Sequence, residues 1–268
     1  MIESLDLTRA LAALPVPLPP GRPVTGEEGE GRRPLLWISD APAPDGLWER
    51  LHRAHPETGL WPLLLAPLDG GPDFRPWLSG ELYPDQASDL SHHDPAVLLR
   101  DWWDSITPDP EEDDADLVDA LAPYVRTWPG LAPAAAVPDG AADREARGLA
   151  GFLQPGRNVR LGLVRADSGA EALVACGWSG PVNHENDIAK IAAVLAGWER
   201  RFGARVVEVG FDTLQLSVAV PPATLAEALP VAAEHTALCS DLVFQGTGTL
   251  TAYAEQLVGS HLWHFWWD

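Results

Sequence analysis

The residue types best suited to chemistry lie in one short segment, where Glu234 and His235 stand a few positions before Cys239. A helix is expected here, and residues four apart on a helix share a face. An imidazole and a thiolate on one face are ligands that zinc prefers. Further zinc ligands would come from Asp241, His261 or His264. The same segment would alternatively supply a nucleophile and a base. The favoured interpretation is structural: a cysteine that packs as a small apolar residue and a histidine that is hydrogen-bonded to a carboxylate.

A polar loop from Gly177 to Asn186 is the most site-like part of the chain. It combines an indole with hydrogen-bonding side chains, namely Trp178, Asn183, His184, Glu185 and Asn186. Functional residues concentrate on such loops. A capped turn, with Asn183 or Asn186 as the N-cap of the next helix, explains the same composition, and turn chemistry alone favours it.

Two further motifs are expected to cap helices. The run His92-His93-Asp94 stands before a helix that begins at Pro95, so Asp94 is the expected N-cap. The run from Gln245 to Thr249 also precedes a helix, and its backbone N–H groups would alternatively hold an anion. No P-loop lysine and no complete Gly-x-Gly-x-x-Gly accompanies it.

The elements that position these residues follow from the pattern of residues 159–268. Alternating residues predict strands at 159–164, 205–209, 214–220 and 261–268. Apolar stripes predict helices at 170–176, 187–202, 221–239 and 250–258. The order β-α-β-β-α-β indicates an α+β, ferredoxin-like domain, an antiparallel sheet with helices on one face. The alternative is a mixed sheet in which residues 170–178 form a strand.

The chain ends in an aromatic run, which contains Trp263, Phe265, Trp266 and Trp267. That much aromatic surface is not stable in water. The run is therefore expected to be a buried strand or a docking surface.

The first part of the chain predicts a small α/β unit at residues 34–107. Its expected elements are strands at 34–39 and 60–66 and helices at 47–54 and 95–106. Pro62 places the second strand at a sheet edge, or itself among that strand's first residues. The expected organisation is an arm (1–33), this unit, an acidic and Ala/Pro-rich linker (108–150) and a separable C-terminal domain (151–268). Within the linker, residues 108–116 and 134–142 are expected to be mobile.

The charge and the cysteines exclude several classes of function. The net charge of −21 disfavours nucleic acid and anionic membranes as partners. The two cysteines make no disulfide framework, and no secretory signal or membrane span is recognised. A cytoplasmic protein is expected.

The C-terminal half resembles a known bacterial family. The similarity rests on the strings Gly177–Gly180, Leu195–Ala204, Ala233–His235 and Gln245–Gly246 and on the ending Trp263–Asp268. These are similar to domain of unknown function 4253 over roughly residues 159–268. The family's Phe-Cys-Pro-Asp string stands here as Leu238-Cys239-Ser240-Asp241. The resemblance implies a boundary near residue 150 and no particular activity.

The leading hypothesis is a non-enzymatic protein-interaction module without cofactor or metal. The alternative is a small-molecule-binding or hydrolytic enzyme with a pocket between the 177–186 loop and the helix of Glu234 and His235. No residue is assigned as catalytic. The candidate ligand-binding residues are Trp178, Asn183, His184, Glu234, His235, His264 and Asp268.

Overall fold

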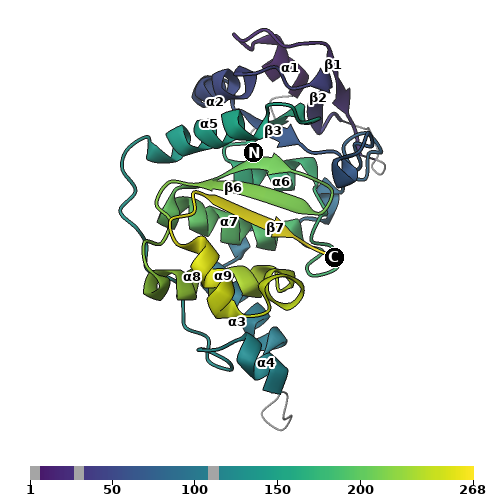
Figure 1. Ribbon diagram of the computed structural model, residues 1–268. Helices are drawn as coiled ribbons and strands as arrows, with labels where there is room; N and C mark the ends of the chain where they lie inside the picture. Colours follow the sequence, from purple (N-terminus) through teal and green to yellow (C-terminus); the bar gives the residue numbers. More distant parts are fainter. Residues whose placement is uncertain (1–6, 27–32, 108–114) are drawn as a thin grey trace.

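One sheet of seven strands runs through the molecule, in the order β1-β2-β4-β3-β5-β6-β7 (Figure 1). The computed structural model describes residues 7–26, 33–107 and 115–268. The strands are β1 (Gly21–Val24), β2 (Leu36–Pro42), β3 (Leu60–Leu65), β4 (Arg160–Arg165), β5 (Ala204–Val209), β6 (Thr213–Val218) and β7 (Leu262–Trp266). Neighbouring strands are antiparallel except β3 and β5, which are parallel. The chain is therefore a mixed α+β protein with a mostly antiparallel sheet.

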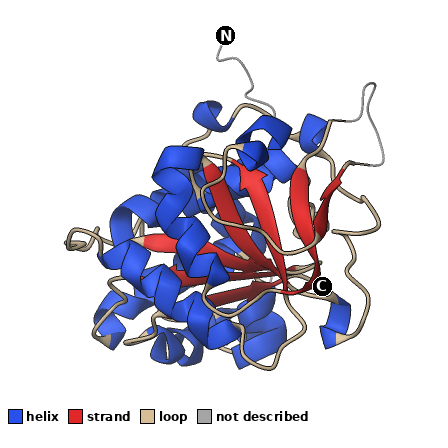
Figure 2. Ribbon diagram, turned by 90° about the horizontal axis from the view of Figure 1, so that it is seen from above, coloured by secondary structure: helices blue, strands red, loops and turns tan. Residues whose placement is uncertain are grey.

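Helices cover both faces of this sheet (Figures 1 and 2). One face carries α3 (Pro95–Ile106), α6 (Gly169–Cys176), α7 (Ile188–Phe202), α8 (Leu225–Leu238) and α9 (Leu250–Leu257). The other carries α1 (Leu7–Ala12), α2 (Leu47–Thr58) and α5 (Ala141–Leu153). The shorter elements are α4 (Ala115–Ala120), the 3₁₀ turns η1 (Leu68–Gly70), η2 (Pro84–Gln86) and η3 (Leu90–His92), and the π-helical η4 (Leu242–Thr247).

The residue pattern of β3 explains the two layers. Leu60 and Leu64 pack with α2 on one face, whereas Trp61, Leu63 and Leu65 join the larger cluster on the other. Side chains alternate along a strand, so a run that is apolar at every position suits a strand covered on both sides. Here that covering comes from helices distant in sequence.

Pro62 lies in the interior of the sheet, so of its two predicted positions the edge is wrong, and the place among the first residues of the strand is the one found. It is the third residue of β3, which pairs with β4 along its length but with β5 only at Leu64 and Leu65. Proline has no N–H to donate, and this part of β3 has no β5 partner to receive one. The two parallel strands diverge here, and the Trp61 indole donates to the carbonyl of Val206 across the gap (3.2 Å).

The ferredoxin-like arrangement is not confirmed. The elements of residues 160–268 follow in the order strand, helices, strand, strand, helices, strand, and α6 to α9 lie on one face. However, β3 lies between β4 and β5, and β7 pairs with β6 at the end of the sheet. Residues 169–176 are helical, so the alternative in which they form a strand is wrong.

Strands from both predicted units share the sheet, because β4 lies between β2 and β3. The division at residues 107 and 150 stays a prediction, and this shared sheet argues against it. Within the predicted linker, α5 packs on the sheet through Ala146 and Ala150, which are fully buried. The predicted arm contributes α1 and β1. Residues 1–6, 27–32 and 108–114 lie outside the described part of the chain.

The aromatic C-terminus is a strand, as one of its two interpretations predicted, and it is buried on one face, whereas His264 and Trp266 on the other face are exposed and partly exposed. Trp263 and Phe265 of β7 are fully buried, and Trp267 is 4% exposed. They pack onto α7 through Trp198, which stacks on Phe265 with ring centroids 5.4 Å apart. In the described residues, no helix has the length and apolarity that crossing a membrane requires.

Candidate functional site

Glu234, the first predicted site residue, has a carboxylate whose two oxygens both accept hydrogen bonds. Its buried carboxylate accepts from the indole of Trp198 (2.7 Å), from the backbone N–H of Ala132 (2.6 Å) and from both terminal nitrogens of Arg201. Arg201 also donates to the carbonyl of Ala132 (2.9 Å). These residues, with His235, form what we call the Glu234 cluster. Its contacts tie the segment around Ala132 to α7 and α8, which is a structural role.

His235 within this cluster and Cys239 beside it are both buried, and they do not meet at a common ligand site. His235 Nδ1 hydrogen-bonds to the hydroxyl of Tyr253 (2.9 Å), so the carboxylate partner that the sequence predicted for this histidine is wrong. Cys239 Sγ donates to the carbonyl of Trp266 (2.9 Å). Burial lowers the pKa of His235 well below its usual value, and nearby Arg201 lowers it further. Burial raises the pKa of Cys239 to about 12, so its thiol stays protonated. Among the described residues, no three His, Cys, Asp or Glu side chains are grouped to hold a metal.

The remaining predicted residues lie in separate places. Trp178 is buried and donates to the carbonyl of Gly210 (2.9 Å), which anchors its loop to the β5–β6 turn. Asn183 donates to the backbone carbonyl of Asp268 (3.3 Å). The His184 ring packs against Trp102, with centroids 5.5 Å apart, and His264 lines a cavity with Tyr253 and Trp263. The seven candidates do not share one pocket, and their assignment to ligand binding stays a prediction.

The two capping motifs before α3 and α9 behave as the sequence predicts, whereas the N-cap of α7 is Asp187, so the prediction of Asn183 or Asn186 at that position is wrong. Asp94 accepts from the backbone N–H of Ala96 (2.9 Å) at the start of α3. Thr249 accepts from the backbone N–H of Ala252 (3.2 Å) at the start of α9. The glycines before Thr249 belong to the π-helical segment η4 and its C-cap.

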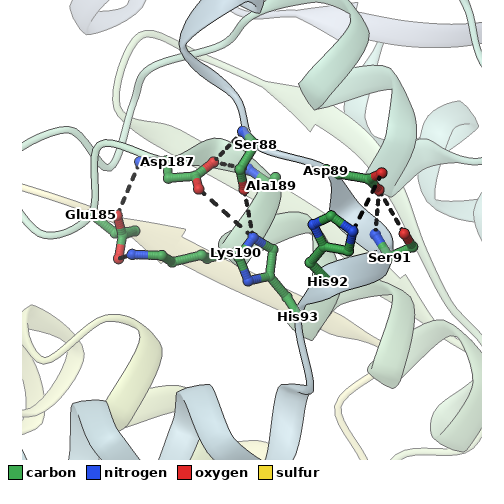
Figure 3. A network of polar contacts seen from close by, with 9 residues as sticks. All are labelled: Ser88, Asp89, Ser91, His92, His93, Glu185, Asp187, Ala189 and Lys190. Atoms are coloured by element: carbon green, nitrogen blue, oxygen red, sulfur yellow. Dashed lines mark hydrogen bonds and ion pairs between the residues drawn. The ribbon is translucent and has the colours of Figure 1, made fainter.

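A serine, a histidine and an aspartate lie close together near the Asp94 cap of α3 (Figure 3). Ser88 Oγ lies 2.6 Å from Nε2 of His93, and Asp187 Oδ2 lies 3.7 Å from the same nitrogen. In a catalytic triad the carboxylate contacts the other ring nitrogen, so this arrangement is not one. Asp187 instead caps α7 through the N–H of Ala189 (3.1 Å) and accepts from the N–H of Ser88 (3.0 Å). The network fastens the loop before α3 to the start of α7.

A different group of residues forms a polar cavity where β3 and β5 diverge. The cavity has a volume of about 410 Å³ and draws on both layers of helices. We call it the Glu199 pocket, and its main residues are His52, His55, Trp61, Asp143, Glu199 and Arg205. They come from α2, β3, α5, α7 and β5. The opening is a consequence of the partial β3–β5 pairing, which leaves room beside Trp61.

Glu199 has the properties of an acid–base group. Burial raises its pKa from 4.5 to about 7, against the opposing effects of Arg205 and of a hydrogen bond from the backbone N–H of Ala170. Its Oε1 atom is buried and has no hydrogen-bond partner among the described residues. A carboxyl with a pKa near 7 exchanges protons efficiently at neutral pH. Such perturbed groups in cavities are typical of functional sites.

The two histidines of α2 form the opposite wall. His52 stacks on Trp48 (centroids 4.8 Å apart) and meets the Trp61 ring edge-on (5.2 Å). Burial lowers its pKa to about 4, so it is neutral at pH 7. Its Nδ1 atom is buried and unpartnered within the part of the chain that the structure describes. His55 Nε2 is hydrogen-bonded to the carbonyl of Ala166 (2.9 Å).

Sequence reasoning missed this pocket. His52 and His55 are spaced i, i+3, which places them near each other on a helix, but solvated helix faces contain many such pairs. Glu199 lies inside the string Leu195–Ala204, which carried the family resemblance. The local signal was therefore present only at Glu199.

The geometry defines a mixed α+β protein with a polar cavity between its helical layers. Residues 160–268 match the model of a family described as Domain of unknown function (DUF4253), which confirms the resemblance seen in the sequence. No curated protein and no solved structure shows significant similarity to the chain. The matched region begins with β4 and contains Glu199 and Arg205, whereas His52, His55 and Asp143 precede it. The Glu199 pocket is thus built partly by the family domain and partly by the rest of the chain.

Proposed function

We propose that this protein binds a small molecule in the Glu199 pocket and that Glu199 exchanges a proton with it. One observation carries the proposal: a largely buried carboxyl lines a cavity, and its Oε1 atom has no partner among the described residues. Burying a polar atom without a hydrogen bond costs free energy, so an unpartnered atom that lines a cavity points to a use other than stability. Binding a ligand group is such a use.

The surrounding residues support acid–base chemistry. Glu199 is near the middle of its titration at neutral pH, while His52 remains neutral beside it. Arg205 lowers the pKa of Glu199 and so stabilises its ionised form. The volume of the cavity falls within the range of small-molecule sites. A reaction that moves a proton to or from a bound substrate fits these groups best.

The protein-interaction module predicted from the sequence rested on the aromatic C-terminus. Trp263, Phe265 and Trp267 are packed into the core, where the first two contact His235, and Trp266 is partly buried. The interaction hypothesis stays a prediction, and no surface is assigned to it. For the small-molecule alternative, we propose the Glu199 pocket as the binding site in place of the one predicted beside the helix of Glu234.

Carbon-13 NMR of the glutamate carboxyl groups tests the proposal. Glu199→Gln identifies the Glu199 signal, and its titration midpoint is expected near pH 7. Glu57→Gln is the matched control, because Glu57 is exposed on α2 and lies outside the lining of the pocket. In a fragment screen followed by NMR, fragments that bind the pocket should then change the amide chemical shifts of Trp61, Ala170 and Glu199. A Glu199 midpoint near 4.5 would show that the carboxyl is an ordinary solvated acid.

A further inference from the structure

We infer that the ligand of the Glu199 pocket carries a cationic N–H donor group, an ammonium or a guanidinium. This inference rests on the proposed function and names its substrate class. It follows from the hydrogen-bonding atoms that the cavity leaves open and from the charges around them.

The hydrogen-bond donors at one end of the cavity are already used. Three backbone N–H groups at the start of α6 already have acceptors. The N–H of Ala170 donates to the Glu199 carboxyl. The N–H of Glu171 donates to the hydroxyl of Ser168 (3.2 Å), and the N–H of Ala172 donates to the carbonyl of Ser168 (3.0 Å). A helix N-terminus binds anions through such groups. Because they are occupied, this end of the cavity offers no ready-made anion site.

Arg205 is also engaged. Its Nε lies 3.4 Å from Asp143 Oδ1, and its Nη1 donates to the carbonyl of Ala204 (2.8 Å). Arg200, which lines the cavity as well, has an exposed side chain and is solvated. Neither arginine is held ready for an anionic ligand.

The open positions are acceptors when Glu199 is ionised and His52 has its proton on Nε2. Glu199 Oε1 and His52 Nδ1 are both buried and unpartnered within residues 7–26, 33–107 and 115–268. A neutral imidazole presents one lone pair, and an ionised carboxyl presents several. Asp143 and Asp167 add two carboxylates to the same lining. A group with several N–H donors and a positive charge satisfies this set, and charge-assisted bonds to a carboxylate are the stronger kind.

The charged neighbours set the pH dependence of such binding. Glu199 faces Arg205 from β5, Glu171 from α6 and Arg200 from its own helix, while His52, His55 and Asp143 approach from α2 and α5. A bound cation favours the ionised carboxyl, so binding releases a proton wherever Glu199 is protonated in the free protein. Affinity for a cation should therefore rise with pH up to about 7 and then level off.

Three small probes of similar size test the inference: methylguanidinium, the neutral N-methylurea and the anion acetate. Binding to the full chain is followed by the amide shifts of Ala170 and Glu199 between pH 5.5 and 8. Methylguanidinium is expected to bind best, with affinity rising by up to tenfold per pH unit below the Glu199 midpoint. Glu199→Gln should weaken it about tenfold or more at pH 8 and abolish the pH dependence, whereas Glu57→Gln should change neither.

The outcomes separate this inference from the proposal beneath it. If N-methylurea or acetate shifts the pocket signals and methylguanidinium does not, the cationic ligand is wrong and the acid–base pocket stands. If no probe shifts them while Glu199 titrates near 7, the cationic ligand is also wrong. A Glu199 midpoint near 4.5, with no probe bound, overturns both.

Discussion

The Glu234 cluster and the Glu199 pocket are built from the same residue types and share helix α7. Each contains a glutamate, a histidine, an arginine and a tryptophan, and the consecutive residues Trp198 and Glu199 serve one each. In the cluster every carboxylate oxygen has donors, and an arginine matches its charge. In the pocket the carboxyl keeps an oxygen without a partner among the described residues. Residue type therefore does not distinguish these two glutamates, whereas the hydrogen bonds that each carboxyl makes do.

The largest effect is expected from Glu234→Gln. The change leaves the guanidinium of Arg201, whose side chain is 13% exposed, without its counter-charge. Breaking a buried ion pair from one side typically costs about 3–5 kcal/mol. The free energy of unfolding, measured with denaturant, should fall by that amount, while Glu57→Gln should change it by less than about 0.5 kcal/mol. A similarly small loss for Glu234→Gln would remove the contrast between the two glutamates.

A smaller effect on stability, which depends on pH, is expected at Glu199. Its pKa is raised from 4.5 to about 7, so the folded protein holds this proton more tightly than the unfolded chain. The resulting stabilisation is complete below pH 4.5 and is lost as pH rises through 7. The stability of the wild type relative to Glu199→Gln should therefore fall by about 3 kcal/mol over that range. His52, whose pKa is lowered, has the opposite pH dependence, but it is present in both proteins and cancels.

Unfolding curves at several pH values measure this difference. If the free energies of unfolding of the wild type and of Glu199→Gln differ by a constant amount from pH 4.5 to 8, the pKa of the Glu199 carboxyl is not perturbed. The comparison with Glu234 would then have to be abandoned, because both glutamates would be structural.

The smallest effect is expected from Tyr253→Phe, which tests a neutral hydrogen bond beside the Glu234 cluster. The change removes the hydroxyl that lies 2.9 Å from His235 Nδ1 and leaves a buried ring nitrogen unpaired. Such losses cost about 1–2 kcal/mol. Denaturant unfolding should show a decrease in that range and less than that of Glu234→Gln. An unchanged stability would mean that His235 is held by its aromatic neighbours alone.

Much of the local structure could be predicted from the sequence. The helix predicted from Pro95 to Ile106 is α3, and the aromatic run is β7, because capping residues and apolar spacing act over a few positions. The helix α5 could not be predicted in this way. Its buried side chains are largely alanines, such as Ala146 and Ala150, and alanine also dominates the Pro-rich stretch before it. Small residues give a weak apolar pattern even where they pack closely.

The pairing of strands and the Glu199 pocket could not be predicted for a common reason. The insertion of β4 beside β3 and the approach of α2 to α7 join segments that are far apart in the chain. Patterns within one element carry no information on such partners. The sequence drew attention to Glu234, His235 and Cys239 because they are close in sequence, whereas His52 and Glu199 become neighbours only in the folded sheet.

The position of β4 also has a consequence for folding of the chain during its synthesis on the ribosome. β2 and β3 are synthesised early, yet each needs β4 as its neighbour, and β4 is made only after α5. Until then both strands expose apolar faces and unpaired backbone groups, which invite association with other chains. The nascent N-terminal half should therefore depend on chaperones for longer than a unit that closes its own sheet.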